Sequence, residues 1–161
     1  MVARSVGTGF DPRYLAVGLV AGIAYGMMEM VSEAVIGKGL WSPLRYIASV
    51  FTLGKDTDPS FALIPVVVGL MGHMMNSVIF GVVFSLWISR LASGLLRLAV
   101  LGMVYAAAIF IAMWYAVLPV IDPAMLVVNG PGFFASHLIY GLLLGVGVSL
   151  VRERRAAAPA F

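Results

Sequence analysis

The sequence predicts an all-α integral membrane protein: a four-helix bundle built from two repeated helical hairpins, each with a short outer interfacial helix. Three observations support this prediction. First, 62% of the 161 residues are hydrophobic and only 11% are charged, whereas a soluble domain is about half apolar and about a quarter charged. Second, four apolar stretches reach the roughly 20 residues that a membrane-spanning helix needs. Third, a sequence pattern recurs in the second and fourth stretches.

The four predicted spans leave no room for a soluble domain, so residues 1–161 are expected to form a single transmembrane domain. The segment before the first span is basic, like the start of a signal peptide, but the apolar run that follows is too long for one and shows no clear A-x-A cleavage site. We therefore expect the first span to be retained. The spans cover residues 14–37, 61–89, 98–118 and 132–151.

Two short helices are predicted in the outer loops, over residues 43–53 and 123–128. In the first, proline suits the initial helical position. Leu44 and Ile47 fall on one face, opposite Arg45 and Ser49, which predicts an amphipathic helix in the membrane interface. In the second, Asp122 is expected to cap the helix.

The second and fourth spans share the pattern H-x7-G-x3-S-L, which contains the only two histidines of the chain. This match predicts an internal duplication of a two-helix hairpin. Because the second and fourth spans run in the same direction, the repeat would be a parallel one. The matching residues are His73, Gly81, Ser85 and Leu86 in one span and His137, Gly145, Ser149 and Leu150 in the other.

The distribution of Lys and Arg predicts that both termini are cytoplasmic and that the protein lies in the inner membrane. With this orientation seven basic residues fall on the inner side and three in the outer loops, which agrees with the positive-inside rule. The rule also accounts for the formal net charge of +3, so no nucleic-acid partner is expected. The inner residues are Arg4, Arg13, Arg90, Arg97, Arg152, Arg154 and Arg155, and the outer ones are Lys38, Arg45 and Lys55.

Two glutamates lie in the first span, where lipid is expected. Glu29 and Glu33 continue a stripe of glycines at four-residue spacing, so they are expected to face other helices. At about 1.5 Å rise per residue, Glu29, His73 and His137 each lie about 22 to 26 Å from the nearest inner arginine of their own helix, with Glu33 about one turn further out. We call Glu29, Glu33, His73 and His137 the Glu/His layer.

Carboxylates and imidazoles on facing helices form a ligand set for a transition metal such as Cu, Fe or Zn, and this is one hypothesis for the layer. An alternative is a b-type haem held by His73 and His137. Another is proton or ion transfer through Glu29 and Glu33. A purely structural role, in which these side chains hydrogen-bond one another and fix helix register, also remains open.

The sequence contains no nucleophile with an adjacent base, no phosphate-binding loop and no dinucleotide fingerprint. We therefore do not expect the chain to be an enzyme on its own. Four short spans leave apolar and small-residue surface facing outwards, which favours contact with lipid and with other integral membrane subunits or further copies of the chain. The sequence thus predicts a subunit or accessory of a larger membrane complex.

Overall fold

The computed structural model describes residues 11–52 and 58–157; Arg4, Lys55 and the last residue of the predicted helix 43–53 lie outside these ranges. Within them, every regular element is helical. The long helices are α1 (Arg13–Val35), α3 (Leu63–Leu86), α4 (Leu95–Ala112) and α6 (Gly130–Ala157).

Four apolar helical segments of the described chain are long enough to cross a membrane, which confirms the four predicted spans. The second includes the 3-10 turn η1 (Ile88–Leu91), and the third continues through η2 (Met113–Val117) and α5 (Leu118–Ile121). The chain is therefore a multi-pass membrane protein whose helices contact lipid.

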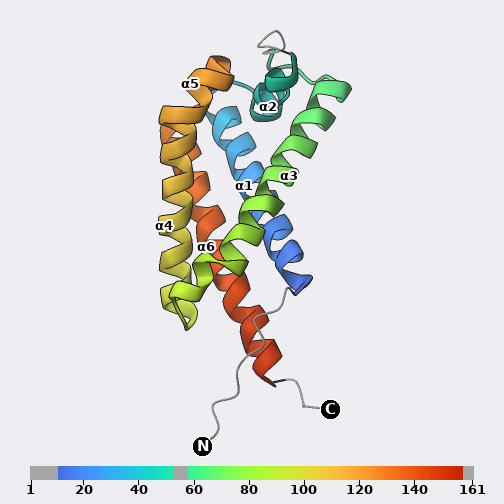
Figure 1. Ribbon diagram of the computed structural model, residues 1–161. Helices are drawn as coiled ribbons and strands as arrows, with labels where there is room; N and C mark the ends of the chain where they lie inside the picture. Colours follow the sequence, from blue (N-terminus) through green and yellow to red (C-terminus); the bar gives the residue numbers. More distant parts are fainter. Residues whose placement is uncertain (1–10, 53–57, 158–161) are drawn as a thin grey trace, which may run out of the picture.

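The helices form two pairs that meet through α1 and α6. Helix α4 packs along α6, α3 packs along α1, and α1 packs against α6. Towards the end of the bundle that carries α2 (Ser42–Thr52), α3 leans away from α4, so that the two helices diverge (Figure 1). We call this end the α2 end and the opposite end, where η1 joins α3 to α4, the η1 end.

Glycine sets the contact between α4 and α6. A Cβ atom at Gly141 would lie 2.1 Å from the carbonyl oxygen of Gly102, and one at Gly145 would lie 2.1 Å from that of Leu98. Such close backbone approach is a main source of packing energy between helices in lipid. A larger residue at either position would separate the two helices.

Helices α1 and α3 also approach each other closely at glycines, at a point nearer the η1 end. A Cβ atom at Gly81 would lie 2.6 Å from the Cα atom of Gly18. Gly81 and Gly145 occupy the same place in the repeated sequence pattern, and each contacts the first helix of its own hairpin. The duplication itself stays a prediction.

Helix α2 packs on α3 at Gly69. The carbonyl oxygen of Leu44 occupies the space that a side chain at residue 69 would need. The sequence predicts Arg45 and Ser49 on the face of this helix opposite Leu44 and Ile47, and the structure shows that both are buried in the protein. Arg45 donates to the carbonyl oxygen of Ser60 at 3.2 Å, and the Ser49 hydroxyl donates to the carboxylate of Asp122. The polar face of α2 is therefore held by protein groups.

The second outer helix is the 3-10 turn η3 (Pro123–Val127), and Asp122 caps it by accepting a hydrogen bond from the backbone N–H of Ala124 at 3.2 Å. Before it, η2 is a short π-helix. Pro119 explains this irregularity, because a proline has no N–H and its ring crowds the carbonyl four residues earlier. The π-turn places Met113 at the edge of the site described next.

Candidate functional site

Tyr25 of α1 brings the two histidines together. Its ring centroid lies 5.0 Å from that of His73 on α3 and 4.8 Å from that of His137 on α6. Tyr140 and Phe133 complete the aromatic cluster, with ring centroids 6.0 and 6.2 Å from that of Tyr25. Three helices therefore contribute to one centre in the half of the bundle nearer the α2 end.

Each histidine is oriented by a backbone carbonyl. Nε2 of His73 lies 2.8 Å from the carbonyl oxygen of Gly22, and Nδ1 of His137 lies 2.8 Å from that of Phe133. A carbonyl oxygen only accepts, so in each neutral imidazole the nitrogen beside it carries the proton. Nδ1 of His73 and Nε2 of His137 are then left as hydrogen-bond acceptors.

The two glutamates are buried, as the sequence predicts: Glu29 is 4% exposed and Glu33 is 0% exposed. One carboxyl oxygen of Glu29 accepts from the Ser136 hydroxyl at 2.8 Å, and one of Glu33 accepts from the backbone N–H of Asn129 at 2.5 Å. Within the described parts of the chain, the second carboxyl oxygen of each is buried without a hydrogen-bond partner. Both carboxyl groups thus retain acceptor capacity.

A cavity of about 20 Å³ lies beside Glu29 and is also lined by Tyr25 and His73. A space of this volume holds one water molecule when polar groups surround it. Glu29 and His73 therefore face the same water-sized site, and Glu33 lies one turn further along α1 towards the α2 end.

A larger cavity of about 310 Å³ opens between α3 and α4, and we call it the histidine cavity. Most of its wall is aliphatic or aromatic, from α2, α3, η2 and α6. Its polar lining includes Tyr25, His73, Asn76, His137 and Tyr140. Such a combination of apolar walls and a few convergent polar groups is typical of small-molecule sites.

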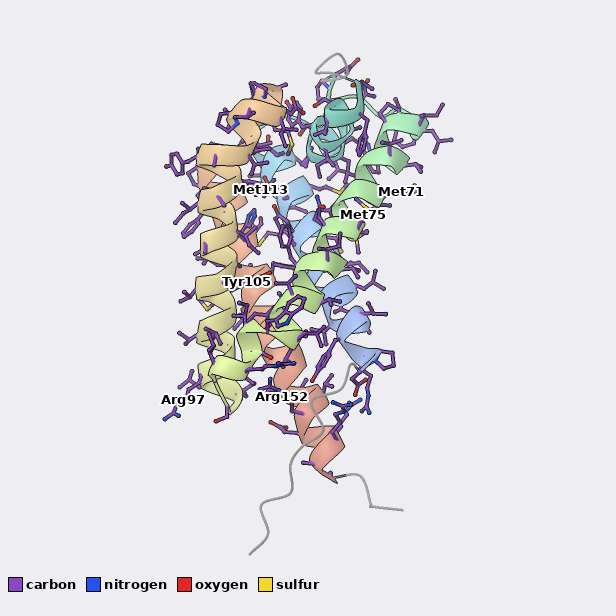
Figure 2. The ribbon with its side chains drawn as sticks, viewed as in Figure 1. Met71, Met75, Arg97, Tyr105, Met113 and Arg152 are labelled. Atoms are coloured by element: carbon purple, nitrogen blue, oxygen red, sulfur yellow. The ribbon has the colours of Figure 1, made fainter. Side chains whose placement is uncertain are left out.

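Two tyrosine hydroxyls form hydrogen bonds between helices on the η1 side of this cavity. The Tyr105 hydroxyl of α4 donates to the carbonyl oxygen of Phe80 at 3.1 Å, and that of Tyr140 donates to the carbonyl oxygen of Ser77 at 2.5 Å. Tyr105 reaches from α4 towards α3 at this level, where the two helices begin to diverge (Figure 2). The cavity therefore lies between these two hydrogen bonds and the α2 end.

Asn76 differs from the other polar residues of α3. His73, Ser77 and Ser85 are buried, whereas Asn76 is exposed and lines the histidine cavity. An exposed carboxamide inside a membrane span is costly because lipid offers it no hydrogen bond. Asn76 therefore presents its carboxamide to the histidine cavity.

The structure does not combine the Glu/His layer into one ligand set. Among the described residues there is no group of three or more His, Asp or Glu side chains that could hold a metal ion. One nitrogen of each histidine is engaged by a backbone carbonyl, and the ring of Tyr25 contacts both imidazoles. The metal and haem hypotheses therefore stay predictions.

Two residues of this centre are absent from the sequence prediction. Tyr25 precedes Glu29 by four residues and so shares its helix face, which is a signal that the sequence does contain. Ser136, the partner of Glu29, directly precedes His137, but no spacing rule connects it to a glutamate on another helix.

Comparison with protein-family models, with curated protein sequences and with solved structures gave no match.

Proposed function

We propose that the chain binds a small lipid-soluble molecule carrying a hydroxyl or N–H group in the histidine cavity. The observation that carries this proposal is the exposed Asn76 carboxamide in a cavity of about 310 Å³ between membrane-spanning helices. This volume lies at the lower end of the roughly 300 to 1,000 Å³ found for ligand sites, so it suits a small ligand.

The histidines determine the chemistry of the ligand. With their protonated nitrogens on backbone carbonyls, His73 and His137 offer acceptor nitrogens, which pair with a donor such as a hydroxyl group. Asn76 supplies both a donor and an acceptor. An alcohol or phenol with an apolar body satisfies these groups and the apolar walls together.

The ligand would enter the histidine cavity from the bilayer, between α3 and α4, which diverge towards the α2 end (Figure 1). Met113 lies at this opening on the α4 side, while Met71 and Met75 of α3 are not among the residues that line the cavity (Figure 2). Met71 and Met75 are 67% and 56% exposed. They therefore serve as matched surface positions for controls.

The test uses naphthol and naphthalene, two aromatic probes that differ by one hydroxyl group. Trp114 packs on Phe133, whose ring contacts His137, so quenching of tryptophan fluorescence reports binding. We expect the purified protein to bind naphthol about tenfold more tightly than naphthalene, since one hydrogen bond contributes about 1 to 1.5 kcal/mol. Asn76→Leu combined with His137→Phe should remove the difference, whereas Met71→Leu should keep it. Equal affinities for the two probes in the parent protein would contradict the proposal.

A second candidate function is proton transfer along Glu33, Glu29 and His73. It is favoured by the two unpartnered carboxyl oxygens and by the water-sized cavity between Glu29 and His73. Proteoliposomes with an internal pH dye should then acidify faster with the parent protein than with Glu29→Gln after an external pH drop. Glu153→Gln, a change on the exposed end of α6, is the control. Identical rates for all three proteins would exclude this function.

We also propose that the chain works as a small subunit or accessory of a larger membrane assembly. Only 22% of the residues in the apolar windows of the first and third spans are buried within the chain, so most of their surface faces lipid or other subunits. Mass measurement in mild detergent or in native lipid particles tests this proposal. A monodisperse particle of one chain under both conditions would contradict it.

A further inference from the structure

A third cavity, of about 570 Å³, lies at the η1 end, and we call it the arginine cavity. It is bounded by the start of α1, the η1 turn, the start of α4 and the end of α6. Its charged lining consists of Arg90, Arg152, Arg155 and Glu153, and its apolar lining includes Leu86 and Leu98. Positive charge therefore exceeds negative charge around a sizeable space at the end of the spans.

Arg152 is held in place by the turn that joins α3 to α4. Its guanidinium donates to the carbonyl oxygens of Ser89 and Ala92 at 3.1 and 3.2 Å, and to the Ser89 hydroxyl at 2.6 Å. A guanidinium has five N–H donors. These three bonds leave two donors for a ligand, on a side chain that is already oriented.

The other charges differ in how they are compensated. Nε of Arg155 lies 2.9 Å from a carboxylate oxygen of Asp11, so part of its charge is neutralised within the chain. Glu153 accepts from the Ser149 hydroxyl at 3.1 Å on its own helix. Arg90 is exposed. Arg90 and Arg152 are thus the cationic groups best placed to meet an external anion.

The level of the cavity matches that of lipid headgroups. Trp87 is 58% exposed directly before η1, and exposed tryptophan at the end of a membrane span is typical of the headgroup region. The lining of the cavity also changes along the spans, from positively charged arginine side chains to apolar leucine side chains. This lining suits a molecule with an anionic head and an apolar body.

We propose that the arginine cavity binds the phosphate-bearing headgroup of an anionic phospholipid, with Arg90 and Arg152 contacting the phosphate and Leu86 and Leu98 contacting the start of the acyl chains. Basic pockets between membrane helices recognise such headgroups. The fork of the Arg152 guanidinium suits two phosphate oxygens. This site is separate from the histidine cavity and does not depend on the function proposed for it.

Native mass spectrometry of the full chain in mild detergent, with added phosphatidylglycerol or phosphatidylcholine, tests the proposal. We expect one phosphatidylglycerol molecule to be retained at least tenfold more tightly than phosphatidylcholine. Arg90→Gln should weaken this binding by about fivefold, the contribution of one arginine near an anionic lipid. Within the described residues the Arg90 side chain makes no hydrogen bond, and its backbone N–H, which donates to the carbonyl oxygen of Trp87 at 3.3 Å, is kept by the substitution. The change is therefore expected to leave the fold intact.

Arg97→Gln is the matched control, because Arg97 lies at the same end of the bundle and is exposed, but does not line the cavity (Figure 2). It should leave phosphatidylglycerol binding within twofold of the parent. Equal losses for Arg90→Gln and Arg97→Gln would overturn the site, because they would indicate general attraction to a basic surface. Displacement of the lipid by an equal concentration of inorganic phosphate would overturn the lipid assignment and indicate a site for the free anion.

Discussion

Replacing Ser136 by alanine removes the one side-chain hydrogen bond that Glu29 receives from the described part of the chain. Ser136 is 0% exposed, and its hydroxyl oxygen lies 2.8 Å from Oε2 of Glu29 and 2.9 Å from the carbonyl oxygen of Gly132. Within the described residues, Oε1 of Glu29 is already without a partner. Ser136→Ala therefore leaves the whole carboxyl group of Glu29 buried without a hydrogen bond from a side chain.

The size of the effect follows from what each partner loses. The carbonyl oxygen of Gly132 keeps its backbone hydrogen bond within α6, so losing the additional bond from Ser136 costs little. Leaving a buried acceptor unpaired costs about 1 to 3 kcal/mol in proteins, and interhelical hydrogen bonds in membranes contribute about 0.6 kcal/mol on average and up to about 1.7. We expect Ser136→Ala to cost about 1 to 2 kcal/mol of folding free energy.

Ser85→Ala is the matched control for this change. Ser85 is a buried serine of another span, and its hydroxyl donates only to the carbonyl oxygen of Gly81, at 2.7 Å on its own helix. Its replacement should change stability by less than about 0.5 kcal/mol. Unfolding in mild detergent with increasing sodium dodecyl sulfate, followed by tryptophan fluorescence, compares the two variants. If both cost the same, the bond between Ser136 and Glu29 contributes nothing, and the carboxyl group is stabilised by other means.

Three further predictions concern packing, pH dependence and orientation. Gly141→Ala should destabilise the protein by about 1 to 3 kcal/mol, because its Cβ would lie 2.1 Å from a carbonyl oxygen of α4. Gly130→Ala on the same helix should be tolerated, since its nearest contact would be a ring carbon at 3.4 Å; equal unfolding midpoints would contradict the packing argument. A backbone N–H and two nearby arginines hold the pKa of Asp11 below its ordinary value of 3.8, so its stabilising contribution is present above about pH 4 and is lost as pH falls through the lowered pKa. Between about pH 4 and the lowered pKa the unfolding midpoint of the parent should fall more steeply with falling pH than that of Asp11→Asn, and parallel curves there would contradict this. A reporter fused after Phe161 should be cytoplasmic and one inserted at Lys55 external, whereas the same side for both would refute the predicted orientation.

The spans were predictable because lipid imposes a simple requirement on sequence. Each crossing needs about 20 apolar residues. The four helical segments found in the structure match the four predicted stretches, and most of their ends agree to within a few residues. The burial of Glu29 and Glu33 was predictable for the same reason, since a carboxyl group in a span must face protein. Both predictions depend on the solvent and not on details of packing.

The orientation of α2 was not predictable from its pattern. An amphipathic sequence shows that a helix has a polar face, but it does not show whether water or protein covers that face. Here Ser49 meets Asp122, and Arg45 meets the backbone of Ser60. These partners lie in segments whose position depends on the complete fold.

The hydrogen-bond partners of the histidines were also not predictable, because they are backbone carbonyls. Any residue provides a carbonyl oxygen, so the sequence contains no sign that Gly22 or Phe133 would orient an imidazole. Side-chain inventories favour metal or haem ligation whenever carboxylates and imidazoles lie at one depth. In the structure, a backbone carbonyl engages one nitrogen of each imidazole, and both histidines line the histidine cavity.

The position of the glycines determines how α3 lies beside that cavity. Helices α1 and α3 approach closely where Gly18 meets Gly81, and further along α1 the ring of Tyr25 packs against His73 of α3. Helix α2 then packs against α3 at Gly69 and supports the end of α3 away from α4. The contacts at Gly81 and Gly69 therefore position α3 at two points along its length, one on each side of His73. On this basis, enlarging Gly69 should displace α2 and alter naphthol binding, although residue 69 does not line the histidine cavity.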